Sequence, residues 1–172
     1  MAHVPVPPER RFYAQDRAVG RFGMRSFAPH LMEAPHWHGH VEGNLLPGAA
    51  MTYLFGEEVV VVPPGRLALF WANVPHQLVR VDPVGEAAPR LTNLYLPLDR
   101  FLLMPHLAAL QVGVVSGGIA LLPPEAVGEA EMARWHRDYR SGDVERVEVL
   151  HMELNAALRR ALIGGVEWLR EP

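Results

Sequence analysis

The sequence contains no cysteine, no lysine and no long hydrophobic run, and its excess of negative charge is small. Without cysteine there is neither a disulfide framework nor a thiolate metal site. No apolar stretch reaches the length of a membrane span or of a signal-peptide core. With 16 basic and 19 acidic residues the net charge is −3, so the chain lacks the basic footprint of a nucleic-acid-binding domain. These absences predict a cytoplasmic protein without membrane contact.

Short apolar runs dominate the first part of the chain, residues 21–122. Hydrophobic residues make up 49% of the 172 residues, enough for one well-packed core. Segments rich in Pro, Gly, Asn and Asp separate the runs and are typical of turns. The runs that we interpret as strands are GRFGMRSF, EGNLL, MTYLF, EVVVV, RLALFW, HQLVRV and RLTNLYL. Many short strands at this spacing predict a mainly β sandwich or closed barrel.

The last part of the chain, residues 123–172, has a helical pattern. A first helix is expected to open at Pro123-Pro124 and to close at Ser141-Gly142, because proline favours the first turn of a helix and glycine its end. A second helix is expected from the N-cap residue Asp143 to Ile163. Its apolar residues recur at three- and four-residue spacing and form one stripe, Val147, Leu150, Leu154, Leu158 and Leu162.

Three of the nine histidines fall within five residues, in the stretch HWHGHVEGN. On a straight strand His36 and Glu42 would lie roughly 20 Å apart, at about 3.3 Å per residue, which is too far to bind one ion. Metal ligands lie within about 2.0–2.2 Å of the ion. A shared site therefore requires a turn after His38, which Gly39 would permit. His76 supplies a fourth ligand, and this set suits zinc, nickel, iron or manganese without distinguishing them.

The same histidines also have a simpler interpretation. An HxH pair is a weak signal by itself, and histidines inside a barrel often only form hydrogen bonds with polar neighbours or with a ligand. The spacing therefore leaves two alternatives open, a metal centre or a metal-free binding site.

The order of these residues resembles the two motifs of the cupin family. The matching residues are His36, His38, Glu42, Gly48, Gly65 and His76. The chain departs from the pattern at His30 and Asn73, where glycine is usual, and at Trp71, where proline is usual. The resemblance implies a double-stranded β-helix, a small jelly-roll barrel, with the motif residues around one interior metal ion.

Four longer segments resemble the sensor domain of AraC-type transcriptional regulators. They are APHLMEAPHWHGHVEGN, GRLALFWANVPHQL, NLYLPLDRFL and MARWHRDY, and the similarity runs from about Phe22 to Trp168. The resemblance implies a cupin barrel that senses a sugar, followed by helices that form a homodimer. It also implies a DNA-binding domain with two helix-turn-helix motifs. Only LREP follows Trp168, so we expect that domain to be absent from this chain.

The expected organisation has three parts. Residues 1–20 would form an N-terminal arm, residues 21–122 the ligand-binding barrel, and residues 123–172 the helical dimerisation segment. DNA would be contacted only through the domain outside this chain.

The resemblance implies that the ligand is a small sugar, such as an α-galactoside. A sugar pocket needs an aromatic plate and fixed hydroxyl partners. We expect Trp71 to stack on the sugar, although it follows an apolar run and suits a core position equally well. The candidates for the hydroxyls are His40, Asn44, Asn93 and Tyr95. Of these, Asn93 and Tyr95 share one face of the strand RLTNLYL, whereas His40 and Asn44 also fit a solvated loop.

The leucine stripe of the second helix has two interpretations. An amphipathic helix usually covers the core of its own chain. The steps from Val147 to Leu150 to Leu154 are those of a heptad seam, and the family resemblance implies a dimer, so we expect a homodimer through this stripe.

A catalytic function is the main alternative. Many cupins with this ligand set are enzymes, and the centre would suit a metal-dependent oxygenase or isomerase. The sequence offers no separate acid–base pair, so we expect ligand binding without turnover.

Overall fold

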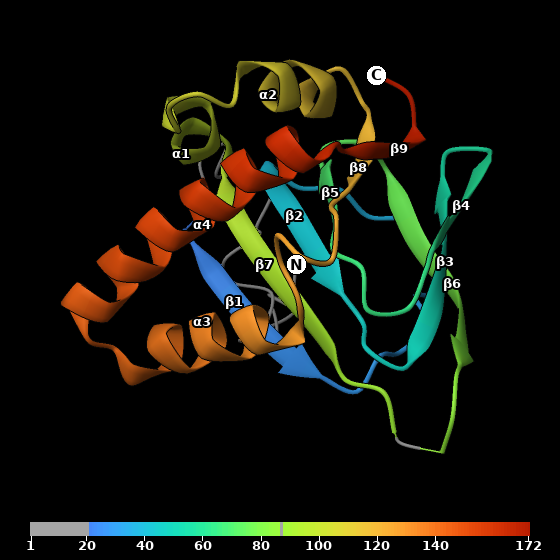
Figure 1. Ribbon diagram of the computed structural model, residues 1–172. Coiled ribbons are helices and arrows are strands. Elements are labelled where there is room, and N and C mark those ends of the chain that lie inside the picture. The colour runs from blue at the N-terminus through green and yellow to red at the C-terminus, as the bar shows by residue number, and fades with distance from the viewer. Residues whose placement is uncertain (1–20, 87) are drawn as a thin grey trace, which may run out of the picture.

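The computed structural model describes residues 21–86 and 88–172, so the predicted arm at residues 1–20 lies outside the described residues. This part of the chain forms nine strands and four helices (Figure 1). The strands are β1 Gly23–Phe27, β2 His40–Leu45, β3 Ala49–Phe55, β4 Glu58–Val62, β5 Ala68–Trp71, β6 His76–Pro83, β7 Leu91–Pro97, β8 Ile119–Leu121 and β9 Glu167–Arg170. The helices are α1 Leu98–Leu103, α2 Ala108–Val115, α3 Glu129–Ser141 and α4 Val144–Gly164.

The strands build two antiparallel sheets. One has six strands in the order β1-β7-β2-β5-β8-β9, and the other has three in the order β4-β3-β6. The predicted mainly β architecture is therefore confirmed. A closed barrel is not found among the described strands, because each sheet keeps its own edges.

Alternation along the strands gives the six-stranded sheet two different buried faces. Its inner face meets the three-stranded sheet around a core that includes Tyr53, Phe55 and Phe70. Its outer face is covered by the helices (Figure 1), and that core includes Val41, Leu94 and Trp135. A side chain on β2, β5 or β7 therefore faces either the space between the sheets or the helices.

The helix α4 begins and ends nearly where the sequence predicts. The Asp143 side chain accepts hydrogen bonds from the backbone N–H groups of Glu145 and Arg146, at 3.0 and 3.4 Å, which caps the helix. The helix α3 ends as predicted but begins at Glu129, not at Pro123-Pro124. Its first turn is fixed by the Gly128 N–H, which donates to the Glu131 carboxylate at 3.0 Å.

Four elements were not predicted, namely α1, α2, β8 and β9. The short helices α1 and α2 interrupt the region expected to contain only strands. The segment after α4 was expected to be helical, but it returns as β9 and pairs with β8. Trp168 of β9 packs on the outer face, and an added Cβ at Gly113 would lie only 2.3 Å from its ring. This tertiary contact, which no local pattern encodes, holds the C-terminal strand in the sheet.

The leucine stripe of α4 belongs to the core of this chain. Leu150, Leu154 and Leu158 are fully buried between α4 and the six-stranded sheet. Val147 and Leu162 are half-buried at the margins. The prediction that this stripe forms a dimer seam is therefore wrong, because its central leucines are already covered.

Within the described residues, no helix is long and apolar enough to cross a membrane.

Candidate metal centre

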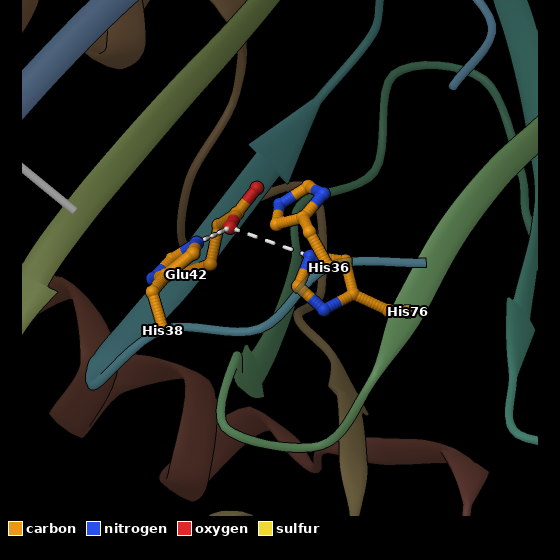
Figure 2. Close-up of side chains that lie close together, drawn as sticks. All are labelled: His36, His38, Glu42 and His76. Atoms are coloured by element: carbon orange, nitrogen blue, oxygen red, sulfur yellow. Dashed lines mark hydrogen bonds and ion pairs between the residues drawn. The ribbon is translucent and has the colours of Figure 1, made fainter. Parts of the chain in front are cut away.

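Three imidazoles and one carboxylate converge between the sheets. One ligand atom from each of His36, His38, Glu42 and His76 lies within 4.8 Å of all the others. Figure 2 shows the four side chains pointing toward one another, with Glu42 between the imidazoles of His38 and His76. His38, Glu42 and His76 are buried and His36 is half-buried. The structure thus brings together the four residues that the motifs predicted as ligands.

The local backbone explains why residues distant in sequence meet. His36 and His76 exchange two backbone hydrogen bonds of 3.0 Å and form an isolated β-bridge. The chain then bends at Gly39 and enters β2 at His40, which returns Glu42 toward the bridge. The predicted turn is present, although Gly39 does not adopt a positive φ.

The two carboxylate oxygens of Glu42 have different environments. Oε2 lies 3.0 Å from Nε2 of His38 and 3.8 Å from Nε2 of His76. Oε1 accepts hydrogen bonds from the side-chain amides of Asn44 and Asn93, at 3.0 and 3.2 Å. The two amides therefore hold Glu42 so that Oε2 faces the imidazoles.

The charge states suit a cation. Burial opposes ionisation of Glu42, but the hydrogen bond from His38 and the neighbouring imidazoles outweigh it and lower its pKa to about 2. Burial is the main cause that lowers the pKa of His76. Glu42 is thus ionised and His76 neutral at neutral pH, which are the forms that bind a metal ion.

The hydrogen bonds of His76 support the same conclusion. Its Nδ1 donates to the Val74 carbonyl at 3.0 Å, so Nε2 carries the lone pair. This Nε2 is buried and has no hydrogen-bond partner among the described residues. Two ligands of one ion at about 2.1 Å can lie at most about 4.2 Å apart. Ligand atoms that are up to 4.8 Å apart would therefore have to close by about 0.6 Å even on opposite sides of an ion, and by more as adjacent ligands.

A relay of hydrogen bonds orients His38. His40 Nε2 lies 3.0 Å from the Arg21 carbonyl, which can only accept, so this nitrogen carries the proton. Burial lowers the pKa of His40, and its remaining nitrogen therefore accepts from Nδ1 of His38 at 3.3 Å. The relay holds His38 Nε2 3.0 Å from Glu42 Oε2, where this nitrogen can either donate its proton to the carboxylate or share a metal ion with it.

This relay changes the interpretation of His40. The residue was predicted to bind sugar hydroxyls, but both of its ring nitrogens are engaged, with Arg21 and with His38. It is buried on β2 and is not a solvated loop residue. Its position suits a residue that orients a metal ligand.

Three predicted sugar contacts lie beside the centre. Asn44 and Asn93 are cross-strand partners on β2 and β7, and Asn93 donates to the Tyr95 hydroxyl at 3.0 Å. Both amide oxygens are buried without a hydrogen-bond partner among the described residues. The Tyr53 hydroxyl accepts from Asn44 at 3.0 Å, a contact that we did not predict. The sequence could have indicated this contact through the alternation in MTYLF, which places Tyr53 and Phe55 on one face of the strand.

Trp71 lies elsewhere. It is paired with Val41 on the outer face of the six-stranded sheet and packs against the core beneath the helices. Its neighbour Phe70 faces the interior instead. The prediction that Trp71 stacks on a sugar in the metal-site interior is therefore wrong, and the alternative core interpretation describes its position.

The sequence of this chain is similar to that of a known regulatory protein. No family model matches the chain. The chain is 31% identical over 142 residues to the melibiose operon regulatory protein of Escherichia coli, in strain K12 and in strain O6:H1. The aligned region covers 81% of this chain but only 45% of each relative, so the chain spans less than half their length. The resemblance to a regulator of this type, indicated by the motifs, is thereby confirmed.

Proposed function

We propose that this chain is the ligand-sensing and dimerisation part of an AraC-type transcriptional regulator. It binds a small sugar in a cupin-like interior beside a divalent transition metal, and DNA is bound by a domain outside this chain. The observation that carries the proposal is its similarity to an operon regulator over 81% of its length. The convergence of three histidines and one glutamate in the interior supports the ligand site.

The residues that would hold the metal are His36, His38, Glu42 and His76. Zinc, nickel, iron and manganese all accept such a donor set. When bound, the ion supplies a Lewis-acidic position that an oxygen of the ligand can occupy. His40, Asn44 and Asn93 orient the ligands through the hydrogen bonds described above.

The buried amides support a hydroxyl-rich ligand. Asn44 and Asn93 present two unpaired oxygens side by side on one face of the sheet. A buried acceptor without a partner costs about 1–3 kcal/mol, and the hydroxyl groups of a sugar would remove that cost. The name of the relatives suggests an α-galactoside as the first sugar to test.

Sugar binding without turnover is the first expected outcome. In calorimetry with the metal-loaded chain, an α-galactoside such as melibiose should bind, and Asn93→Leu should weaken binding by about tenfold or more, because a buried hydrogen-bond partner is lost. Asn155→Leu, at a half-buried asparagine of α4 outside the space between the sheets, is the matched control and should have no effect on sugar binding. If no sugar of a galactoside panel binds, the sugar part of the proposal is wrong.

The same samples distinguish a sensor from a metal-dependent cupin enzyme. The regulator similarity favours a sensor, whereas the metal ligand set alone suits both. Chromatography of the sugars after hours of incubation should recover them unchanged. Metal-dependent product formation at about 1 per second or faster would instead assign the chain to the enzymes.

A different face of α4 is available for a homodimer. Exposed residues recur at alternating steps of four and three, namely Glu145, Val149, Met152, Ala156, Arg159 and Ile163. The exposed fractions of Val149, Met152 and Ile163 are 51%, 69% and 74%. Glu145 lies at the start of this face and Arg159 near its end, so an antiparallel copy would bring these opposite charges together. We therefore place the dimer contact on this face.

Met152→Asp should convert such a dimer into a folded monomer. A charge in the middle of an apolar seam opposes association, but the exposed side chain contributes little to the core of one chain. Analytical ultracentrifugation should show the change in mass, and circular dichroism should be unchanged. Val61→Asp, also at an exposed apolar residue but on β4, is the control. A wild-type chain that stays monomeric at high micromolar concentration would contradict the dimer.

A further inference from the structure

A cleft of about 290 Å³ lies outside the metal site, between α3 and the end of the six-stranded sheet formed by β1 and β7. Ser26 and Thr92, which are cross-strand partners, contribute hydroxyls from the sheet. Three more polar side chains, Glu129, His136 and Arg137, come from α3, and Arg90 lies just before β7. The cleft is thus built by segments far apart in the sequence, and it opens on the opposite face of the sheet from the metal ligands.

The cleft holds two arginines and one carboxylate, that of Glu129. Within residues 21–86 and 88–172, neither Arg90 nor Arg137 forms an ion pair, whereas Arg66, Arg134 and Arg170 do. Arg90 donates to the Ser26 carbonyl at 2.9 Å, which fixes its guanidinium at the rim and leaves further N–H groups available. Burial, Arg140 and Arg90 together lower the pKa of the His136 imidazole. An anion would relieve the repulsion among these groups.

The other residues that line the cleft indicate that its ligand has an organic part besides the anionic group. Leu45 and Met132 are buried at the floor, so part of the cleft is apolar. Glu129 adds one acceptor, while Ser26 and Thr92 each add a donor and an acceptor. A volume of about 290 Å³ equals that of roughly ten water molecules at about 30 Å³ each, which leaves room for an organic body beside the anionic group.

We propose that this cleft binds a small phosphorylated polyol or sugar, with its phosphate on Arg90, Arg137 and His136 and its hydroxyls on Glu129, Ser26 and Thr92. The two guanidiniums offer planar pairs of N–H donors that suit the oxygens of a phosphate, and the neutral imidazole adds one further hydrogen-bonding position. The ligand joins α3 to β1 and β7. Because α3 is also tied to α4 by the Arg134–Glu153 ion pair of 2.9 Å, the bound ligand stabilises the packing of both helices on the sheet.

Glycerol 3-phosphate is the probe for this site. Calorimetry with the full chain at low salt and in the presence of EDTA should detect binding, and it should persist in His76→Ala, which separates this cleft from the metal centre. Arg90→Gln combined with Arg137→Gln should weaken binding by about tenfold or more, because charge-assisted hydrogen bonds are lost. Arg160→Gln removes one exposed arginine from α4, outside the cleft, and should leave the affinity unchanged.

Glu129→Gln gives a test in the opposite direction. Removing this carboxylate should tighten binding of inorganic phosphate and reduce the preference for glycerol 3-phosphate over inorganic phosphate. The proposal is overturned if glycerol 3-phosphate does not bind at millimolar concentration. It is equally overturned if binding is the same in the double arginine variant, or if inorganic phosphate binds as tightly as the organic phosphate in the unmodified chain.

Discussion

His76→Ala is expected to lower the metal affinity of the chain by more than about a hundredfold, because changes in residues that only support metal ligands already cost 10–100-fold. His76 presents a buried Nε2 without a hydrogen-bond partner among the described residues, and its other nitrogen is fixed by Val74. Its loss leaves the carboxylate of Glu42 with two imidazoles in place of three. Elemental analysis of tag-free protein, reconstituted and desalted, should give about one equivalent of metal for the unmodified chain and far less for the variant.

The control for this experiment is His30→Ala. His30 is exposed and lies outside the group of four ligands, so its removal should leave the metal content unchanged. Circular dichroism of the metal-free proteins should show that both variants remain folded. A substoichiometric metal content in the unmodified chain after reconstitution would favour the metal-free alternative, in which the histidines bind the ligand directly.

Leu154→Ala is expected to lower the free energy of unfolding by about 2–5 kcal/mol, the usual cost of removing a buried leucine side chain. Leu154 is fully buried in the core between α4 and the six-stranded sheet. A cavity there would lie in the centre of the contact and could not be filled by a small movement of one residue. Urea unfolding followed by circular dichroism measures the difference.

Met152→Ala is the matched variant on the same helix. Met152 is 69% exposed, so at low protein concentration its truncation should change the stability by less than about 0.5 kcal/mol. A small loss of stability in Leu154→Ala together with a loss of dimer would restore the leucine stripe as an interface. A large loss without a change in association would support the assignment of this stripe to the core.

The metal-site and core experiments address the two buried faces of the same six-stranded sheet. β2 carries Glu42 and Asn44 on its inner face and Val41 and Leu45 on the outer face, beneath the helices. β7 carries Asn93 and Tyr95 inside and Leu94 and Leu96 outside in the same way. The candidate ligand site and the helices therefore share the same strands, and each strand residue belongs to one side only.

The sequence by itself determined the residues that meet at the candidate metal centre and most of the strands. The spacing of His36, His38 and Glu42 restricts the geometry because a strand advances about 3.3 Å per residue, so only a turn could bring them together. Alternation predicted that Asn93 and Tyr95 share a face. The boundaries of α4 followed from local chemistry, since Asp143 caps the helix through its own side chain.

Only the tertiary structure decided which partner each apolar face has. A leucine stripe looks the same whether it packs on its own sheet or on another chain, and Leu154 is buried only because α4 crosses the six-stranded sheet. Trp71 and Phe70 are adjacent, so alternation places them on opposite faces of β5, but only the packing of the two sheets and the helices decides that Phe70 faces the interior. β9 was likewise invisible in the sequence, because its hydrogen bonds go to β8, far away along the chain. Local patterns specify an element and its faces, whereas the surface that covers each face depends on contacts between segments distant in sequence.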